Sequence, residues 1–312
     1  MGKAGVLQIA HQLLGRVGIF AVLLKGTLPG AVLLLLKQIH LIGADLRPFR
    51  EEGPPDTETV FRLVHIHLLI HSAQLIGRIH SFTDARRCIE SARRVGFKNI
   101  SADIIFALPY QTTEEFTRVV TDIISTGVDH ISAYSLQIEQ GTPFYEKRQE
   151  LILPDEDGEE EQYEALCDIL KANGFLHYEI SSFCKDGFQS RHNLNYWDCG
   201  EYFGFGAGAH SFFNKKRFSA ENDVLAFIEK TKVSCFEPTD YFSAEAISEQ
   251  ESAEEKILLG LRTANGARIP ESAHSSARRI AEMGFGEFTD GVLRLNSKGF
   301  RVSNEIIAEI LI

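Results

Sequence analysis

The sequence predicts an α/β fold, and two observations support this class. From residue 80 onward, segments with the pattern of strands alternate with segments with the pattern of helices, as in parallel sheets joined by helical crossovers. Of the 312 residues, 44% are hydrophobic and 24% are charged, which is close to the average of globular domains and sufficient for a large core. The alternation fits a barrel or half-barrel of the TIM type, or an open doubly wound sheet.

The helices and strands of this pattern can be placed in order. They are a helix over 83–97, a strand over 99–109, a helix over 112–127, a strand over 128–139, a helix over 153–175 and a strand over 176–181. Thr83 is the expected N-cap of the first helix, while Thr112 and Glu115 match the Ser/Thr-x-x-Glu capping box of the second. In a barrel or an open sheet, ligands bind at the carboxyl ends of the strands. The polar residues near those ends are Asp103, Tyr134, Gln137, Glu139, Glu179 and Ser181.

Residues 183–213 have a different composition, with six Phe, two Tyr, the only Trp of the chain, two His and five Gly. This composition predicts a loop-rich aromatic surface. The closely spaced glycines of 204–210 predict either a tight turn or a backbone that approaches a flat or bulky group, and the sequence favours neither.

The last part of the chain predicts a small helical domain. Amphipathic helices are expected over 244–263 and 272–285, followed within 291–312 by a short β element and a terminal helix. This order is typical of a winged-helix-like domain. The chain carries 32 Lys and Arg against 43 Asp and Glu, a net charge of −11, which argues against nucleic acid as a partner. We therefore expect a packing or docking domain.

The N-terminal segment and the cysteines indicate the compartment. The apolar runs within residues 1–43 are interrupted by Lys25, Pro29 and Lys37 and are too short for a stable membrane span. The five cysteines show no CxxC or CxxxCxxC spacing, so neither a disulfide framework nor a sequence-local iron–sulfur site is predicted. Reduced thiols and a cytoplasmic protein are the expectation.

Six segments in one order resemble the oxygen-independent coproporphyrinogen III oxidase family of radical S-adenosylmethionine (SAM) proteins. They are IGRIHS (76–81), SADIIFALPYQT (101–112), HISAYSLQIEQGTPFY (130–145), HYEISSF (177–183), SRHNLNYW (190–197) and FGAGAHS (205–211). HNLNYW resembles the motif that marks the heme chaperones of this family rather than its decarboxylating oxidases. Six motifs in one order make the resemblance highly specific.

The resemblance implies an architecture and a set of ligands. It implies a partial TIM-like (β/α) barrel over 72–235 that includes the heme-motif loop, and a small C-terminal, winged-helix-like domain over 236–312. Residues 1–71 form an atypical N-terminal segment that does not resemble the family. The implied ligands are a [4Fe–4S] cluster, SAM, and a heme that is passed to a client protein.

Three residues match SAM-site positions of the family. Arg78 and Asp103 resemble SAM-contacting residues, and Gln137 occupies a place near the SAM adenine. A buried acid satisfied by backbone groups or an arginine is the structural alternative for Asp103, and a satisfied polar strand residue is the alternative for Gln137.

The heme motif supplies the other candidates. His192 is the best candidate for the metal ligand, because neutral imidazole is the usual proximal ligand of heme iron. Tyr196 and Trp197 would provide flat aromatic area against the porphyrin, and Arg191 could pair with a propionate. His210 is the second candidate for the iron ligand.

The chain departs from the family where the cluster is expected. The family holds its cluster with CxxxCxxC, whereas this chain has no cysteine before Cys88, and Ile66 stands where a glutamine is expected. Because SAM cleavage needs the cluster, we predict no catalytic residue and no radical chemistry in this chain.

Three interpretations remain open at this point. The favoured one is a heme-binding, chaperone-like protein that delivers heme to a client. The second is an oxygen-independent coproporphyrinogen III oxidase or dehydrogenase of porphyrin biosynthesis. The third is a degenerate, truncated family member without activity.

Overall fold

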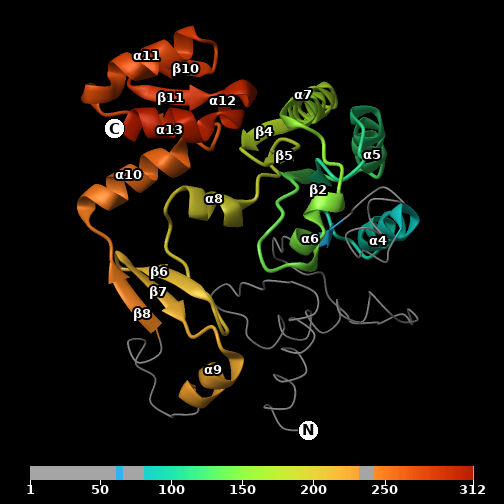
Figure 1. The fold of residues 1–312 in the computed structure, drawn as a ribbon, viewed down its shortest axis with the longest axis horizontal. Coiled ribbons are helices and arrows are strands. Elements are labelled where there is room, and N and C mark those ends of the chain that lie inside the picture. The colour runs from blue at the N-terminus through green and yellow to red at the C-terminus, as the bar shows by residue number, and fades with distance from the viewer. Residues whose placement is uncertain (1–60, 66–80, 232–241, 312) are drawn as a thin grey trace. The chain divides into compact units, whose positions relative to one another are not determined.

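The computed structural model of the chain describes residues 61–65, 81–231 and 242–311 (Figure 1). These residues form two compact units. The larger unit contains 61–65, 81–200 and 248–311, and the smaller unit contains the rest of the described residues. None of the helices in these ranges is long and apolar enough to cross a membrane.

A five-stranded sheet forms the centre of the larger unit. Its order is β1 (Phe61–His65), β2 (Ile100–Phe106), β3 (His130–Ser135), β5 (Ser182–Cys184) and β4 (Leu176–Glu179). The pairs β1–β2 and β2–β3 are parallel, as the alternation predicts, and the mixed α/β fold class is confirmed. The strand expected over 176–181 is shorter and does not pair with β3. It forms a hairpin with β5, because only two residues join them, and β5 lies antiparallel between β3 and β4.

Three helices follow the predicted positions. They are α4 (Phe82–Arg94), α5 (Thr113–Ser125) and α7 (Glu156–Ala172), with the short α6 (Pro143–Glu146) and the 3₁₀ turn η1 (Arg148–Glu150) between the last two. The capping box of Thr112 and Glu115 is confirmed. Thr83 is the wrong N-cap for α4. Ser81 caps this helix, because its side chain and that of Asp84 bond each other's backbone N–H groups.

The two faces of the sheet differ in chemistry, since successive strand residues point to opposite sides. One face is apolar and packs with buried residues of α4, α5 and α7; it consists of Ala102, Ile104, Phe106, Ile131, Ala133 and Phe183. The other face carries buried polar side chains, namely Ser101, Asp103, His130, Ser132 and Ser182. The described helices α4, α5 and α7 therefore build their core on the apolar face, and buried polar groups follow the strands on the other face.

The C-terminal part of the larger unit has its own core. Its elements are α10 (Glu249–Gly260), β9 (Ala267–Arg268), η3 (Glu271–Ala273), α11 (His274–Glu282), β10 (Gly286–Thr289), β11 (Val292–Leu295), α12 (Ser297–Arg301) and α13 (Ser303–Leu311). The predicted order of helices and a β element is confirmed. The sheet β10–β11–β9 contains a strand, β9, that the sequence pattern does not predict. A strand of two residues is too short to show an alternation of polar and apolar residues.

Hydrogen bonds connect this C-terminal part to strand β4. The Ile180 N–H donates to the Arg262 carbonyl at 2.9 Å, and the Ala264 N–H donates to the Tyr178 carbonyl at 2.9 Å. An edge strand without such partners exposes a row of unpaired backbone groups. The chain after α10 therefore protects the outer edge of β4.

His177 lies where the two cores of this unit meet. Its ring stacks on Phe183 of the sheet core at 4.1 Å and meets the edge of Phe300 of the C-terminal core at 4.9 Å between ring centroids. Its nitrogens lie 3.3 Å from Ser297 Oγ and 3.4 Å from the Ile180 carbonyl. Burial lowers the pKa of the imidazole to about 4, although the backbone contacts act in the opposite direction.

The smaller unit is built on three antiparallel strands. They are β6 (His210–Phe213), β7 (Lys216–Ala220) and β8 (Phe242–Ala246), with α9 (Val224–Lys230) between the last two. Gly204 has a structural role here, because a Cβ at this position would lie 2.2 Å from the His210 carbonyl oxygen. The close approach at this glycine is thus to the chain's own backbone.

The segment 183–213, predicted to be loop-rich and aromatic, also contains a short helix and short strands that the sequence pattern does not place. This segment contains the end of β5, helix α8 (Arg191–Trp197) and β6. These elements have three, seven and four residues. Elements this short have no clear hydrophobic period, and their partners elsewhere in the fold decide whether they form.

The burial of His177 predicts a pH-dependent stability. Between pH 6.5 and about 4 the unfolded imidazole binds a proton that the folded one does not. The free energy of unfolding should therefore be highest above pH 6.5 and fall by about 3 kcal/mol as the pH drops through this range. Urea unfolding of the wild type and His177→Gln across this range measures the effect. The His177→Gln curve should be flatter by this amount, whereas the exposed-site control His210→Gln should follow the wild type. Parallel curves for the wild type and His177→Gln would contradict the assignment.

Candidate functional site

The HNLNYW motif forms helix α8. The helix begins because the Ser190 side chain accepts the Asn193 N–H at 3.3 Å, as an N-cap does. It ends where the Asp198 N–H donates to the Leu194 carbonyl at 2.8 Å and Cys199 takes a positive φ of 55°. The helix packs against α10 within the same unit.

Helix α8 brings two of the predicted heme residues together. His192 and Tyr196 are four residues apart and share a helix face, with ring centroids 4.8 Å apart and ring planes at 83°. His192 is exposed, and Tyr196 and Trp197 are half-buried. Trp197 is five residues from His192, so it points to a different side of the helix. The helix thus presents an accessible imidazole beside an aromatic ring.

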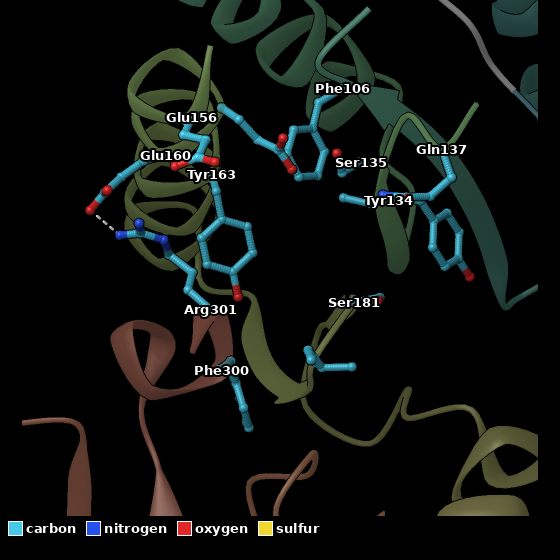
Figure 2. A pocket seen from close by; sticks show the side chains of 13 residues that line it. Phe106, Tyr134, Ser135, Gln137, Glu156, Glu160, Tyr163, Ser181, Phe300 and Arg301 are labelled. Carbon is cyan, nitrogen blue, oxygen red and sulfur yellow. Dashed lines mark hydrogen bonds and ion pairs between the residues drawn. The ribbon is translucent and has the colours of Figure 1, made fainter. Parts of the chain in front are cut away.

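A cavity of about 490 Å³ lies elsewhere in the larger unit, near the carboxyl ends of β2 and β3. Its walls come from these strands, from the start of α7 and from α12. Figure 2 shows the ion pair of Glu160 and Arg301 at one side and Tyr134 and Gln137 at the other. Arg301 lowers the pKa of the Glu160 carboxyl through a hydrogen bond and through its charge. The volume suits a small organic ligand.

The structure separates the predicted SAM residues. Gln137 is exposed and lines the cavity, together with Tyr134 and Ser181. Asp103 is buried on the polar face of β2 and does not line it. The cavity is lined instead by Phe106 and Ala133 of the apolar face and by Tyr134 and Gln137 near the strand ends. Arg78 lies outside the described residues.

The described cysteines do not form a cluster site. Cys88, Cys167, Cys184 and Cys199 come from α4, α7, β5 and the end of α8, and none of them forms a disulfide. Within the described residues, no group of three or more His, Cys, Asp or Glu side chains could hold a metal ion. Burial raises the pKa of Cys167 to about 11 and that of Cys184 to about 12, so both are thiols at neutral pH. An iron–sulfur cluster requires thiolates, and these residues do not fit one.

The remaining candidate, His210, lies at the start of β6 in the smaller unit, where it is exposed. It forms a direct cross-strand pair with Ser219. It belongs to a different compact unit from His192.

The α7 and α12 side of the cavity has no signature in the sequence pattern. In the sequence, the acidic residues at the start of α7 are explained by their favourable interaction with the helix dipole. That explanation gives no sign that Glu156 and Glu160 also line a cavity. Arg301 lies about 140 residues away in the chain and pairs with Glu160 and Glu164.

Comparisons with known proteins identify the class. No family model matches the sequence. The fold is similar to the solved structure of coproporphyrinogen III oxidase (HemN) from Escherichia coli, described as a radical SAM enzyme. The TM-score is 0.62 and the identity 14%, and the match covers 77% of this chain and 61% of that chain. The larger part of the chain therefore has the fold of this radical SAM class.

Curated relatives identify the branch. The chain is 34% identical over 249 residues to the heme chaperone HemW of Bacillus subtilis, covering 76% of this chain. It is 32% identical over 252 residues to the heme chaperone HemW of Lactococcus lactis, with the same coverage. It spans 65% of the length of each of these relatives. The chain is a homologue of these heme chaperone HemW proteins.

The buried thiols make a labelling prediction. At pH 7.5 a maleimide should modify Cys167 and Cys184 about a hundredfold more slowly in the folded chain than in guanidinium, because the thiolate is the reactive form and burial suppresses it. Mass spectrometry of digested samples gives the rate for each cysteine. Equal rates in the folded and unfolded chain would show that these thiols are ionised or accessible.

Proposed function

We propose that this chain is a heme-binding, chaperone-like protein that holds heme at helix α8 and passes it to a client protein. The observation that carries the proposal is that HNLNYW forms a capped helix that presents an accessible His192 beside Tyr196. Homology to proteins named heme chaperone HemW supports it.

The residues of α8 fit the chemistry of heme. A neutral imidazole is the usual proximal ligand of heme iron, and His192 is the residue that would hold it. The Tyr196 ring, on the same helix face as His192, would pack against the porphyrin. Trp197 points to a different side of the helix and would not share this face. The exposed Arg191 would pair with a propionate through its guanidinium. Bound heme would supply the iron centre that the client needs.

The proposal does not include radical chemistry. The cysteines of this sequence do not supply a cluster site, so no SAM cleavage is derived for this chain. Gln137 at the cavity is the one described residue of the SAM set that lies where a small ligand fits. Heme binding should therefore be independent of added SAM.

Heme delivery requires that the client protein can reach the bound heme. A chaperone must release its ligand to the client, so the bound heme has to stay accessible to that client. His192 on α8 meets this condition. The client would be a protein with its own empty heme site.

A heme titration of the purified chain tests the proposal. The wild type should bind heme saturably with a Soret shift, and His192→Ala should weaken binding about tenfold or more, because it loses the axial ligand. His210→Ala is the matched control, since it removes the other exposed candidate and should leave the affinity unchanged. A loss of affinity in His210→Ala alone would assign the ligand to the smaller unit. A folded wild-type chain without saturable binding would contradict heme binding altogether.

A further inference from the structure

A chain of buried hydrogen bonds crosses the polar face of the sheet and ends at helix α8. It starts at Ser101 on β2, whose Oγ lies 2.8 Å from His130 Nδ1 on β3. His130 Nε2 lies 2.8 Å from the Tyr178 hydroxyl on β4. The Ser190 backbone N–H, immediately before α8, donates to this hydroxyl at 3.2 Å. These contacts thus connect the parallel strands β2 and β3, the edge strand β4 and the N-cap residue of α8.

All four residues that form this series of hydrogen bonds are buried. Their exposed fractions are 4% for Ser101, 3% for His130, 7% for Tyr178 and 6% for Ser190. A neutral imidazole can donate through one nitrogen and accept through the other, so His130 can link the two hydroxyls. Burial raises the pKa of the Tyr178 hydroxyl, which therefore stays protonated at neutral pH. A buried polar network of this kind is costly to break, because each separated group loses its partner without gaining water.

Ser190 receives two separate constraints. Its backbone N–H is held by Tyr178, and its side chain accepts the Asn193 N–H and caps α8. Fixing the backbone at the N-cap fixes where the first turn of the helix starts. His192 lies in that turn. The Tyr178 hydroxyl therefore controls the placement of the imidazole without touching it.

We propose that Tyr178 and His130 are positioning residues, which hold α8 in the orientation that presents His192 to heme. The proposal rests on the proposed function of α8 for its biological meaning. Its structural part, the attachment of α8 to the sheet, is independent of heme. The two parts can therefore be tested separately.

Trp197 provides a direct readout of the structural part. It is the only tryptophan of the chain and lies on α8, so its fluorescence reports on this helix alone. In the heme-free protein, Tyr178→Phe should shift the Trp197 emission to the red and increase its quenching by acrylamide. The far-UV circular dichroism should remain that of the wild type, since only one hydroxyl is removed. His130→Gln should change the emission less, because an amide can also donate and accept.

Tyr163→Phe is the matched control. It removes another tyrosine hydroxyl of the same unit, on α7, which lines the cavity and makes no hydrogen bond to α8. It should leave both the emission and the acrylamide quenching of Trp197 unchanged. An equal change in Tyr163→Phe and Tyr178→Phe, or no change in Tyr178→Phe, would overturn the positioning role.

Heme titration of the same variants tests the second part. Tyr178→Phe should raise the Kd for heme about tenfold while keeping the wild-type Soret position at saturation, because His192 still ligates but is less often in place. An unchanged Kd together with a changed Trp197 signal would show that the attachment exists and does not serve heme binding, which overturns the proposal. If the wild type itself binds no heme while Trp197 responds to Tyr178→Phe, the proposed function fails and the attachment of α8 stands.

Discussion

The reversal of the chain at Ile180 and Ser181 is the constraint on which much of the larger unit depends. Because two residues join β4 to β5, the strands pair antiparallel and β5 enters the sheet beside β3. Successive residues of β4 then point to opposite faces. Tyr178 reaches His130 on the polar face, and His177 stacks on Phe183 and reaches Phe300 on the other. One short hairpin thus connects the sheet, the motif helix and the C-terminal core.

The two faces of the sheet serve different sites. The apolar face and α7 form the main core and, at the carboxyl ends of the strands, one wall of the cavity with Arg301. The polar face carries the hydrogen bonds that lead from Ser101 to the start of α8. A ligand in the cavity and a heme on α8 would therefore meet different groups of the same sheet.

The radical SAM fold and the heme motif lead to different conclusions about this chain. The fold is similar to that of an oxidase described as a radical SAM enzyme. Radical SAM chemistry uses an iron–sulfur cluster, and this sequence has no CxxxCxxC spacing to hold one. The heme motif needs only a positioned imidazole and aromatic area, and α8 supplies both. Heme binding therefore requires fewer groups that this sequence lacks than radical chemistry does. The relatives named heme chaperone fit this conclusion, and the chain spans 65% of the length of the first two of them.

The sequence by itself determined the alternation of helices and strands, the Thr112 capping box and the motif order, because these depend on neighbours within a few residues or on a resemblance carried by short segments. The tertiary structure alone decided the antiparallel position of β5, the pairing of Arg301 with Glu160 and the path from His130 to Ser190. These contacts join residues far apart in the chain, and a local pattern contains no information on which distant group fills a given space. His130 and Tyr178 look like ordinary strand residues in the sequence. Only the register of three strands places them in contact and gives them a connection to the heme motif.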